Sequence, residues 1–322
     1  MNSASLGRTG LSVSAIGLGC VGLTAIPRQS DALTLLEAAY DLGISHFDTA
    51  RAYGAGFSEE ILGRFAKGKR DQITISTKFG ILPPPMVVGN RQFVSAVKEG
   101  LRHIPILDRA VRRRLAAGAA VPKLFTPDAC RTSLEKSLST LNTEYVDFFF
   151  LHNGTRSDAE LDDLIETATR LREAGKIRAF GISSPIAYVG ESLDDFPSIY
   201  SVFQGDHGVV GGGHWKNRGL RGIIAFATLG QLRPLIEALS KYPARRDAWS
   251  ITLDADLLDK QLIASLLIQA ALDANRDGGL LVGTRNIDHL ATAVAAISAT
   301  TSADTLAAFR VMCVEMLSGH SA

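Results

Sequence analysis

Residues 43–78 read GISHFDTARAYGAGFSEEILGRFAKGKRDQITISTK, and this stretch indicates the fold most directly. A short apolar run, SHFDTA (45–50), precedes a segment of helical periodicity from Ser58 to Ala66. The next run, ITISTK (73–78), alternates β-branched and polar residues as strands do. Because parallel strands need a crossover connection, usually a helix, this strand-helix-strand order predicts a parallel βα unit.

The same alternation extends to both sides of this unit. An earlier run, SAIGLG, ends at Gly19 and precedes a helix expected from Ser30 to Leu42. A later helix is expected from Asp158 to Ala174, and another helical segment near Pro185. The apolar runs YVDFFFLH, IRAFGIS, SVFQ, GIIAFA and GLLVG bring the count to eight, which is the number that closes a parallel barrel.

We therefore expect an α/β fold, a (β/α)8 TIM barrel, formed by residues 1–322 as one domain. The opening ASLGRTGLSVS predicts a β-hairpin, which could close the bottom of the barrel. Residues 80–125, 205–220 and 228–258 are expected to form long loops at the C-terminal face. Trp215 and Trp249 lie in these stretches, where either one could line a pocket or be buried in the core.

The segment 80–125 is basic. For this segment an exposed helical lid with a solvated face is favoured over an anion-binding patch, and 205–220 is rich enough in glycine to suggest a mobile loop. The basic residues of the first segment are Arg102, Arg109, Arg112, Arg113, Arg114 and Lys123.

Composition excludes several classes of function. Lys plus Arg (34) and Asp plus Glu (33) nearly cancel, so neither nucleic acid nor an anionic membrane is expected as a partner. Three cysteines without paired spacing argue against disulfides and a thiolate zinc site, and the histidines show no metal-ligand spacing, so no metal is expected. A signal peptide and a membrane-spanning run are both missing from the sequence, which indicates a cytoplasmic protein.

Four polar residues stand at or just beyond the ends of predicted strands, where the active site of a barrel lies. They are Asp48, Tyr53, Lys78 and His152. A single such residue is more often structural, but together they can transfer a proton. An ammonium stabilises a neighbouring phenolate and a carboxylate holds the ammonium in place, so Lys78 would tune Tyr53 and Asp48 would anchor Lys78. His152 would orient a carbonyl oxygen.

The segments LGRTGLSVSAIGLGC, GISHFDTARAYGAGFSEEILGRFA, TKFG and YVDFFFLH resemble the aldo-keto reductase family, over nearly the whole chain. The resemblance implies an NAD(P)(H)-dependent oxidoreductase that interconverts an aldehyde or ketone and its alcohol, with Tyr53 as general acid or base. It also implies that Asp48, Lys78 and His152 complete the catalytic tetrad. The expected partner is a small carbonyl or alcohol substrate, and the expected assembly is a monomer or small homo-oligomer.

The resemblance also assigns the cofactor contacts, with departures from the family pattern. Ser184 stands where the family has Asn, and Phe226 where it has Tyr, which keeps the stacking face. Thr292 and Ala293 replace the Glu-Asn pair beside the adenine. Arg285 favours a 2′-phosphate, so NADP(H) is favoured and NAD(H) is possible. The implied contacts are Gly19, Cys20, Asp48, Ser183, Ser184, Gln204, Phe226, Ala227, Leu229, Gly283, Thr284, Arg285 and His289.

Two other functions remain open from the sequence. Lys78 at a strand end could form a Schiff base with a carbonyl, although a neighbouring carboxylate disfavours the neutral amine that this needs. A catalytically weak, cofactor-binding regulatory subunit is the second alternative. No GxGxxG fingerprint is present, so the dinucleotide is not expected to bind in the doubly wound manner.

Overall fold

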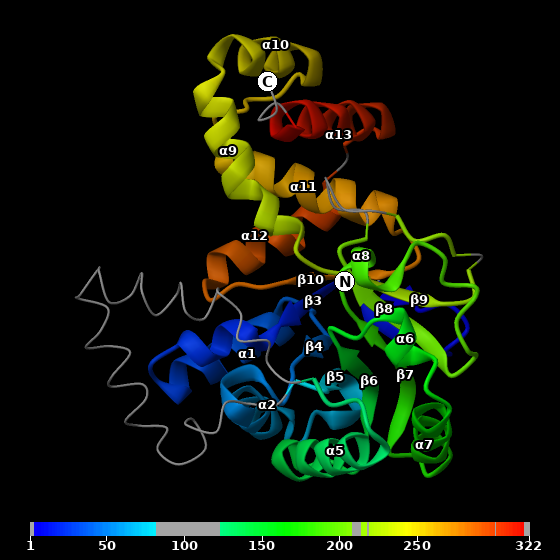
Figure 1. The fold of residues 1–322 in the computed structure, drawn as a ribbon. Helices are drawn as coiled ribbons and strands as arrows, with labels where there is room; N and C mark the ends of the chain where they lie inside the picture. The colour runs from blue at the N-terminus through cyan, green and yellow to red at the C-terminus, as the bar shows by residue number, and fades with distance from the viewer. Residues whose placement is uncertain (1–2, 82–122, 208–213, 218, 300, 319–322) are drawn as a thin grey trace, which may run out of the picture.

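The computed structural model describes residues 3–81, 123–207, 214–217, 219–299 and 301–318, and within them a closed parallel barrel confirms the predicted fold. Five arginines of the basic segment, Arg102 to Arg114, and residues 208–213 of the glycine-rich segment lie outside the described residues. Eight strands form the barrel, with β10 pairing with β3 to close it (Figure 1). They are β3 (Ile16–Gly19), β4 (His46–Asp48), β5 (Thr74–Phe79), β6 (Val146–His152), β7 (Ile177–Ser183), β8 (Tyr200–Gly205), β9 (Gly222–Ala225) and β10 (Gly279–Val282).

The expected hairpin is also present, and it closes the amino-terminal end of the barrel. Strands β1 (Ser3–Ser5) and β2 (Ser12–Ser14) pair antiparallel. Leu6 and Val13 are buried in one cluster with the inward-facing Phe148 and Phe150 of β6. A Cβ built on Gly222, where β9 begins, would lie 2.6 Å from the Cβ of Leu6, so this close approach requires glycine.

Helices cover the outside of the barrel (Figure 1). The expected helix from Asp158 to Ala174 is interrupted: a short turn, α6 (Arg156–Ala159), precedes α7 (Asp162–Glu173). Thr155 caps α6 in a capping box with Asp158, which separates that turn from α7. The other helices are α1 (Gln29–Asp41), α2 (Phe57–Ala66), α5 (Pro127–Leu141), α8 (Ile186–Val189), α11 (Lys260–Ala274) and α12 (Ile287–Ser298).

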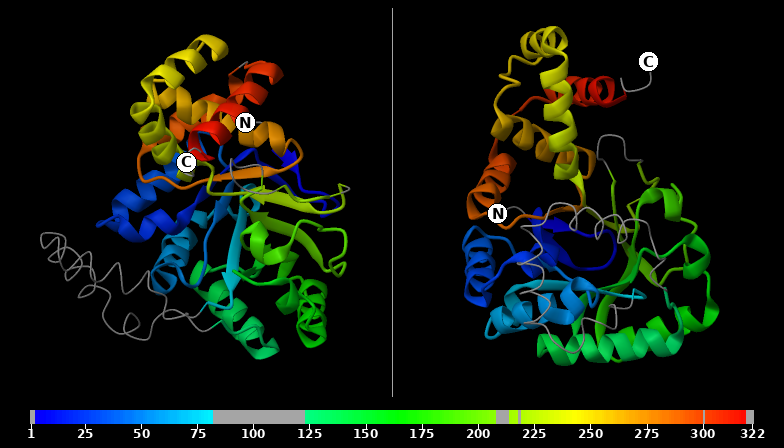
Figure 2. Two further views of the ribbon diagram at one scale, coloured as in Figure 1. Left: turned by 45° about the horizontal axis from the view of Figure 1, so that its top comes forward. Right: turned by 60° about the vertical axis from the view of Figure 1, so that its left-hand side comes forward.

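A second layer of helices lies outside α11, at the top of Figure 1 and again apart from the barrel in Figure 2. It consists of α9 (Leu232–Lys241), α10 (Pro243–Leu253) and α13 (Ala303–Ser318). Helix α11 is apolar on more than one side: Ile268 and Ala271 belong to the barrel cluster, whereas Leu266 and Leu267 belong to the cluster of the second layer. A helix that is hydrophobic all round has to be buried on both sides, and this layer buries the outer one.

The prediction that residues 228–258 form a loop over the barrel mouth is therefore wrong. They form the short 3-10 helix η5 (Thr228–Gln231), followed by α9 and α10. Leu235 and Leu239 recur at helical spacing and are buried in the outer cluster. Trp249 packs against that cluster, whereas Trp215 is buried beside Phe203 of β8.

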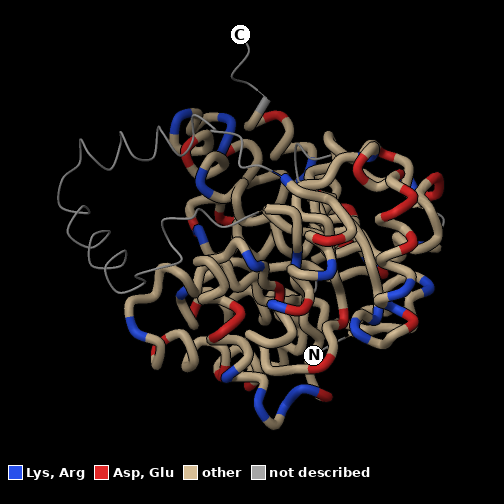
Figure 3. The backbone as a smooth tube through the Cα atoms, turned by 60° about the horizontal axis from the view of Figure 1, so that its bottom comes forward, with Lys and Arg blue, Asp and Glu red and all other residues tan. Residues whose placement is uncertain are grey.

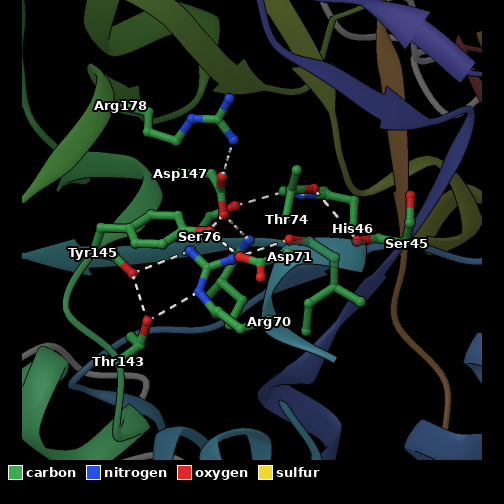
Figure 4. A network of polar contacts seen from close by, with 12 residues as sticks. Ser45, His46, Arg70, Asp71, Thr74, Ser76, Thr143, Tyr145, Asp147 and Arg178 are labelled. Atoms are coloured by element: carbon green, nitrogen blue, oxygen red, sulfur yellow. Dashed lines mark hydrogen bonds and ion pairs between the residues drawn. The ribbon is translucent and has the colours of Figure 1, made fainter. Parts of the chain in front are cut away.

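A polar network ties strands together at the amino-terminal end of the barrel (Figure 4). The fully buried carboxylate of Asp147 accepts hydrogen bonds from Arg70 at 2.8 Å, Arg178 at 2.8 Å and the backbone N–H of Ile75 at 2.9 Å. A buried charge is tolerated only when it is paired and hydrogen-bonded, and here both conditions are met. This network links β5, β6 and β7 far from the strand ends that carry the candidate active site.

Charged residues of both signs are spread along the described chain (Figure 3). Basic and acidic residues are interspersed in the view of Figure 3. None of the helices in the described part of the chain combines the length and apolar character needed to cross a bilayer. Within the same residues, no group of three or more acidic, histidine or cysteine side chains is arranged to hold a metal ion.

Candidate active site

A buried ion pair lies at the C-terminal ends of two neighbouring strands. Asp48 ends β4 and Lys78 lies on β5, and their side chains approach to 2.6 Å. The Lys78 ammonium also donates to the carbonyl of Thr49 at 2.9 Å and to the hydroxyl of Tyr53 at 3.3 Å, so its three donors are all engaged. Burial alone would lower the pKa of Lys78, but Asp48 and Tyr53 outweigh it and raise the pKa above its ordinary value. Lys78 is therefore a fixed cation.

Tyr53 reaches this pair from the loop after β4. It begins the 3-10 helix η2 (Tyr53–Gly56), in which Gly54 and Gly56 have φ of 60° and 90°, a region that favours glycine. Arg51 lies against Gly56 and forms a 2.6 Å ion pair with the buried Glu59 of α2, which holds the loop. The hydroxyl of Tyr53 has no acceptor for its hydrogen among the described residues, so it is available to a ligand.

The pKa of Tyr53 is higher than expected from the neighbouring Lys78 ammonium alone. Burial, the largest effect, raises the pKa of Tyr53, while the Lys78 ammonium lowers it, and the net result is a pKa above the ordinary value. Lys78 acts in the predicted direction, but it offsets desolvation only in part. Tyr53 is consequently protonated at neutral pH and can serve as a proton donor.

His152 ends β6 on the other side of Tyr53, and the two rings meet edge to face with centroids 5.8 Å apart. Burial lowers the pKa of His152 to about 3, with further contributions from the charges of Lys78 and Lys123. The imidazole is therefore neutral at physiological pH. Neither ring nitrogen is hydrogen-bonded to another described residue, which leaves an N–H group free to donate toward a ligand oxygen.

Two expected nicotinamide contacts join the same network. Gln204 of β8 donates from Nε2 to the second oxygen of Asp48 at 2.8 Å, and Ser183 of β7 donates to Oε1 of Gln204. Asp48 thus connects Lys78 on one side with Gln204 on the other. The chain of contacts fixes polar groups from four strands, β4, β5, β7 and β8, around one point at the carboxyl end of the barrel.

The remaining residues expected near the nicotinamide differ in burial, in free hydrogen-bonding groups and in backbone conformation. Ser184 is fully buried and its hydroxyl donates to the carbonyl of Gly154 at 2.7 Å, so its only hydroxyl hydrogen is already used. Phe226, just after β9, is half-buried, and Leu229 is half-buried in η5. Ala227 between them has φ of 67°, a conformation that costs free energy in a residue with a side chain and that recurs at functional sites.

A surface cavity of about 510 Å³ lies beside the N-terminus of α12. It gathers all four residues expected near the adenosine phosphate, namely Gly283, Thr284, Arg285 and His289, together with Ala25, Ile26, Pro27 and Asn286. The guanidinium of Arg285 contacts the carbonyl of Ala25 at 3.4 Å and forms no ion pair with a described carboxylate. A helix N-terminus beside an unpaired guanidinium is suited to an anionic group.

Gly19 lies between this cavity and the ion pair. In the barrel it pairs with Asp48 of β4, and a Cβ built on it would lie 3.9 Å from the Cα of Gly283. The next residue, Cys20, is fully buried, and its carbonyl accepts a hydrogen bond from the hydroxyl of Ser58 at 3.0 Å, so it offers a ligand no exposed group. Gly19 therefore lies close both to Asp48 of β4 and to Gly283, which follows β10.

Sequence reasoning missed several groups at this face. The carbonyl of Thr49 holds Lys78, but a backbone group leaves no signal in the residue type. Ala25, Ile26 and Pro27 line the cavity although they are small or apolar residues of an irregular segment. Lys123 lies near enough to His152 to affect its charge, yet the sequence placed it only in a basic segment.

Comparisons with known proteins agree with the fold. The family model for the aldo/keto reductase family matches residues 15–202. An uncharacterized oxidoreductase of Bacillus subtilis, YqkF, is 33% identical over 184 residues, which are 57% of this chain and 49% of that protein. D-threo-aldose 1-dehydrogenase of a Pseudomonas species is 31% identical over 184 residues, 55% of this chain and 52% of that protein.

The chain spans about half the length of the curated relatives that it matches. Among solved structures, an aldo-keto reductase of Bacillus halodurans in its holo form superposes with a TM-score of 0.65 at 18% identity, covering 97% of this chain and 96% of that one. This likeness concerns the fold. Since the family model matches more than half of the sequence, the chain belongs to the aldo/keto reductase family.

Proposed function

We propose that the chain is an NAD(P)(H)-dependent oxidoreductase that interconverts an aldehyde or ketone and the corresponding alcohol, with Tyr53 as the general acid or base. The observation that carries the proposal is the placement of the Tyr53 hydroxyl, 3.3 Å from an ammonium that is itself held by the buried Asp48. A neutral histidine with free ring nitrogens lies beside it. Together, these side chains supply a proton donor, a hydrogen-bond donor and a nearby positive charge for a substrate oxygen that becomes negatively charged.

The proposed mechanism follows from the protonation states. A substrate oxygen would accept hydrogen bonds from the hydroxyl of Tyr53 and an N–H of His152. The nicotinamide supplies the hydride when it is bound. As negative charge develops on the oxygen, the Tyr53 proton transfers to it, and Lys78 stabilises the phenolate that remains. In the direction of oxidation the same groups act in reverse, with the phenolate as base.

The residues at the barrel mouth support the proposal of a bound dinucleotide. Ser183 and Gln204 present an ordered polar pair at the position proposed for the nicotinamide, and Phe226 offers a half-buried ring there. The cavity at α12 would hold the adenosine phosphate, where Arg285 is free of acidic partners in the described chain. We propose NADP(H) as the preferred cofactor, because a guanidinium can pair with the 2′-phosphate that NAD lacks.

The geometry disfavours Schiff-base chemistry at Lys78. A lysine nucleophile must be a neutral amine with a free lone pair. Lys78 instead has all three hydrogen-bond donors engaged, and its pKa is raised. A regulatory, cofactor-binding role without turnover is the remaining alternative, and it is separated from catalysis by a turnover assay.

The assay follows the loss of NADPH or NADH absorbance while sugars, steroids and aromatic aldehydes are offered in turn. We expect steady turnover with at least one carbonyl substrate and a lower KM for NADPH than for NADH. The name of one matched relative, D-threo-aldose 1-dehydrogenase, makes sugars a sensible part of the panel. Tight binding of the cofactor without turnover of any substrate in either direction would contradict the proposal and support the regulatory role.

A further inference from the structure

Lys123 brings an ammonium group to the mouth of the barrel without belonging to the Tyr53 network. Its Nζ donates to the backbone carbonyl of Asn153 at 2.7 Å, and Asn153 directly follows His152. The backbone of Lys123 pairs with Ile81 in an antiparallel bridge, which fixes it just beyond the end of β5. The charge therefore lies over the strand ends that carry the proposed catalytic side chains.

This ammonium has hydrogen-bonding capacity to spare. A lysine has three N–H donors, and Asn153 takes one of them. Lys123 forms no ion pair with any acidic side chain in the described chain. The carboxylate of Asp206, just after β8, accepts from the backbone N–H of Ile186 at 2.8 Å. Two donors of Lys123 are thus available to a ligand.

An exposed aromatic ring lies beside the same group. Tyr188 of α8 is 52% exposed, and its ring centroid is 5.6 Å from Nζ of Lys123. Such a ring offers an apolar face to the body of a bound molecule while the ammonium offers a charge. Asn153 has φ of 56°, in the left-handed region, so the backbone that receives the Lys123 hydrogen bond is held in a sparsely populated conformation.

Unlike Lys78, Lys123 has no acidic partner among the described residues of the candidate active site. The charge of Lys78 is matched by Asp48 at 2.6 Å. His152 is neutral at physiological pH. Lys123, which is hydrogen-bonded to the residue after His152, therefore places a positive charge without an acidic partner in the described chain next to the group proposed to hold the substrate oxygen.

We infer that Lys123 and Tyr188 form a specificity site for carbonyl substrates that carry a carboxylate, an inference that rests on the proposed function. The carboxylate pairs with the two open donors of Lys123, and the apolar body lies on the ring of Tyr188. The single positive charge of Lys123 matches the single negative charge of a carboxylate, whereas a phosphate monoester carries about −1.5 to −2 at pH 7. Lys123 here selects the substrate and takes no part in proton transfer.

The test compares substrates that differ only in charge. The acids are 3- and 4-carboxybenzaldehyde, and the neutral controls are their methyl esters, so the size and the reacting aldehyde are nearly the same. The variants are Lys123→Gln, which retains a donor for the Asn153 carbonyl but no charge, and Lys123→Arg, which retains the charge. Values of kcat and KM are measured for each protein with saturating NADPH.

For Lys123→Gln we expect KM for at least one carboxybenzaldehyde to rise about tenfold, the usual size of one lost charged hydrogen bond. Its kcat and both constants for the esters should change less than about twofold. Lys123→Arg, which keeps the positive charge, should retain most of the preference for the acids over the esters that Lys123→Gln loses. In the original protein, added salt should raise KM for the acids but not for the esters.

If KM changed equally for the acids and the esters in Lys123→Gln, Lys123 would only anchor the backbone at Asn153, and the inference would be wrong. An unchanged KM for both isomeric acids would contradict it equally. Ester turnover by the original protein separates this failure from a failure of the proposed function, because the esters need Tyr53 and the cofactor but not Lys123. Without ester or acid turnover, the proposed function itself would be at fault.

Discussion

Replacing Lys78 with Met tests how the buried ion pair supports both stability and chemistry. Met is similar in length but carries no charge and no donors. The change removes the 2.6 Å contact to Asp48 and the hydrogen bonds to Thr49 and Tyr53. Asp48, only 3% exposed, is then left with Gln204 as its one side-chain donor among the described residues.

An unpaired buried charge of this kind costs about 3–5 kcal/mol of the free energy of unfolding. That is a large part of the roughly 5–15 kcal/mol that stabilises a typical protein. The double variant Asp48→Asn/Lys78→Met carries neither charge, so it should recover most of the loss. Both variants should lose turnover, because each lacks the ammonium that stabilises the Tyr53 phenolate.

The assay is urea denaturation at neutral pH, followed by circular dichroism, for the original protein, both single variants and the double variant. The cycle gives the coupling energy between the two side chains. A Lys78→Met protein within about 1 kcal/mol of the original would refute the reasoning, since that is below the cost of an uncompensated buried charge. A double variant less stable than Lys78→Met would refute it as well.

Three further predictions concern the rest of the barrel. Asp147→Asn should lower the free energy of unfolding by roughly 3 kcal/mol in urea titrations, because Arg70 loses its buried partner, while kcat of the folded protein stays near normal. Burial lowers the pKa of His46 to about 4, so folding excludes its proton. His46 should therefore contribute roughly 3 kcal/mol to the stability lost as pH falls from about 6.5 to 4, and His46→Gln should lose less than the original protein by about that amount in the same titrations. Arg285→Ala should raise the Kd for NADPH about tenfold and that for NADH less than twofold, measured by quenching of protein fluorescence; equal losses would assign Arg285 to packing.

The barrel could be predicted because its strands are buried on both faces and leave unbroken apolar runs. YVDFFFLH and IRAFGIS are examples that became β6 and β7 with nearly the expected bounds. The polar residue that ends each run also indicated the edge where side chains converge. Asp48, Lys78 and His152 were found by that signal, and the hairpin was found by its glycine-containing turn.

Other features depend on contacts that no local pattern specifies. The spacing of Leu235 and Leu239 is helical, yet their partner is the outer side of α11, so the second layer was mistaken for a loop. The sequence gives Ser184 a hydroxyl, but only the fold shows that Gly154 uses it. The acidity of Tyr53 depends on the balance between burial and Lys78, which requires the folded distances.

The central claim is that Tyr53 donates the proton, and its most direct test is Tyr53→Phe, which deletes only the hydroxyl. The measurement is kcat for an aldehyde that the original protein reduces, at saturating NADPH, together with the Kd for NADPH. We predict that kcat falls by ~10²-fold or more, the usual size of a general acid contribution, while the Kd for NADPH changes less than about twofold. A Tyr53→Phe protein that retains near-full turnover with several carbonyl substrates would contradict the account, because the proton would then come from another group.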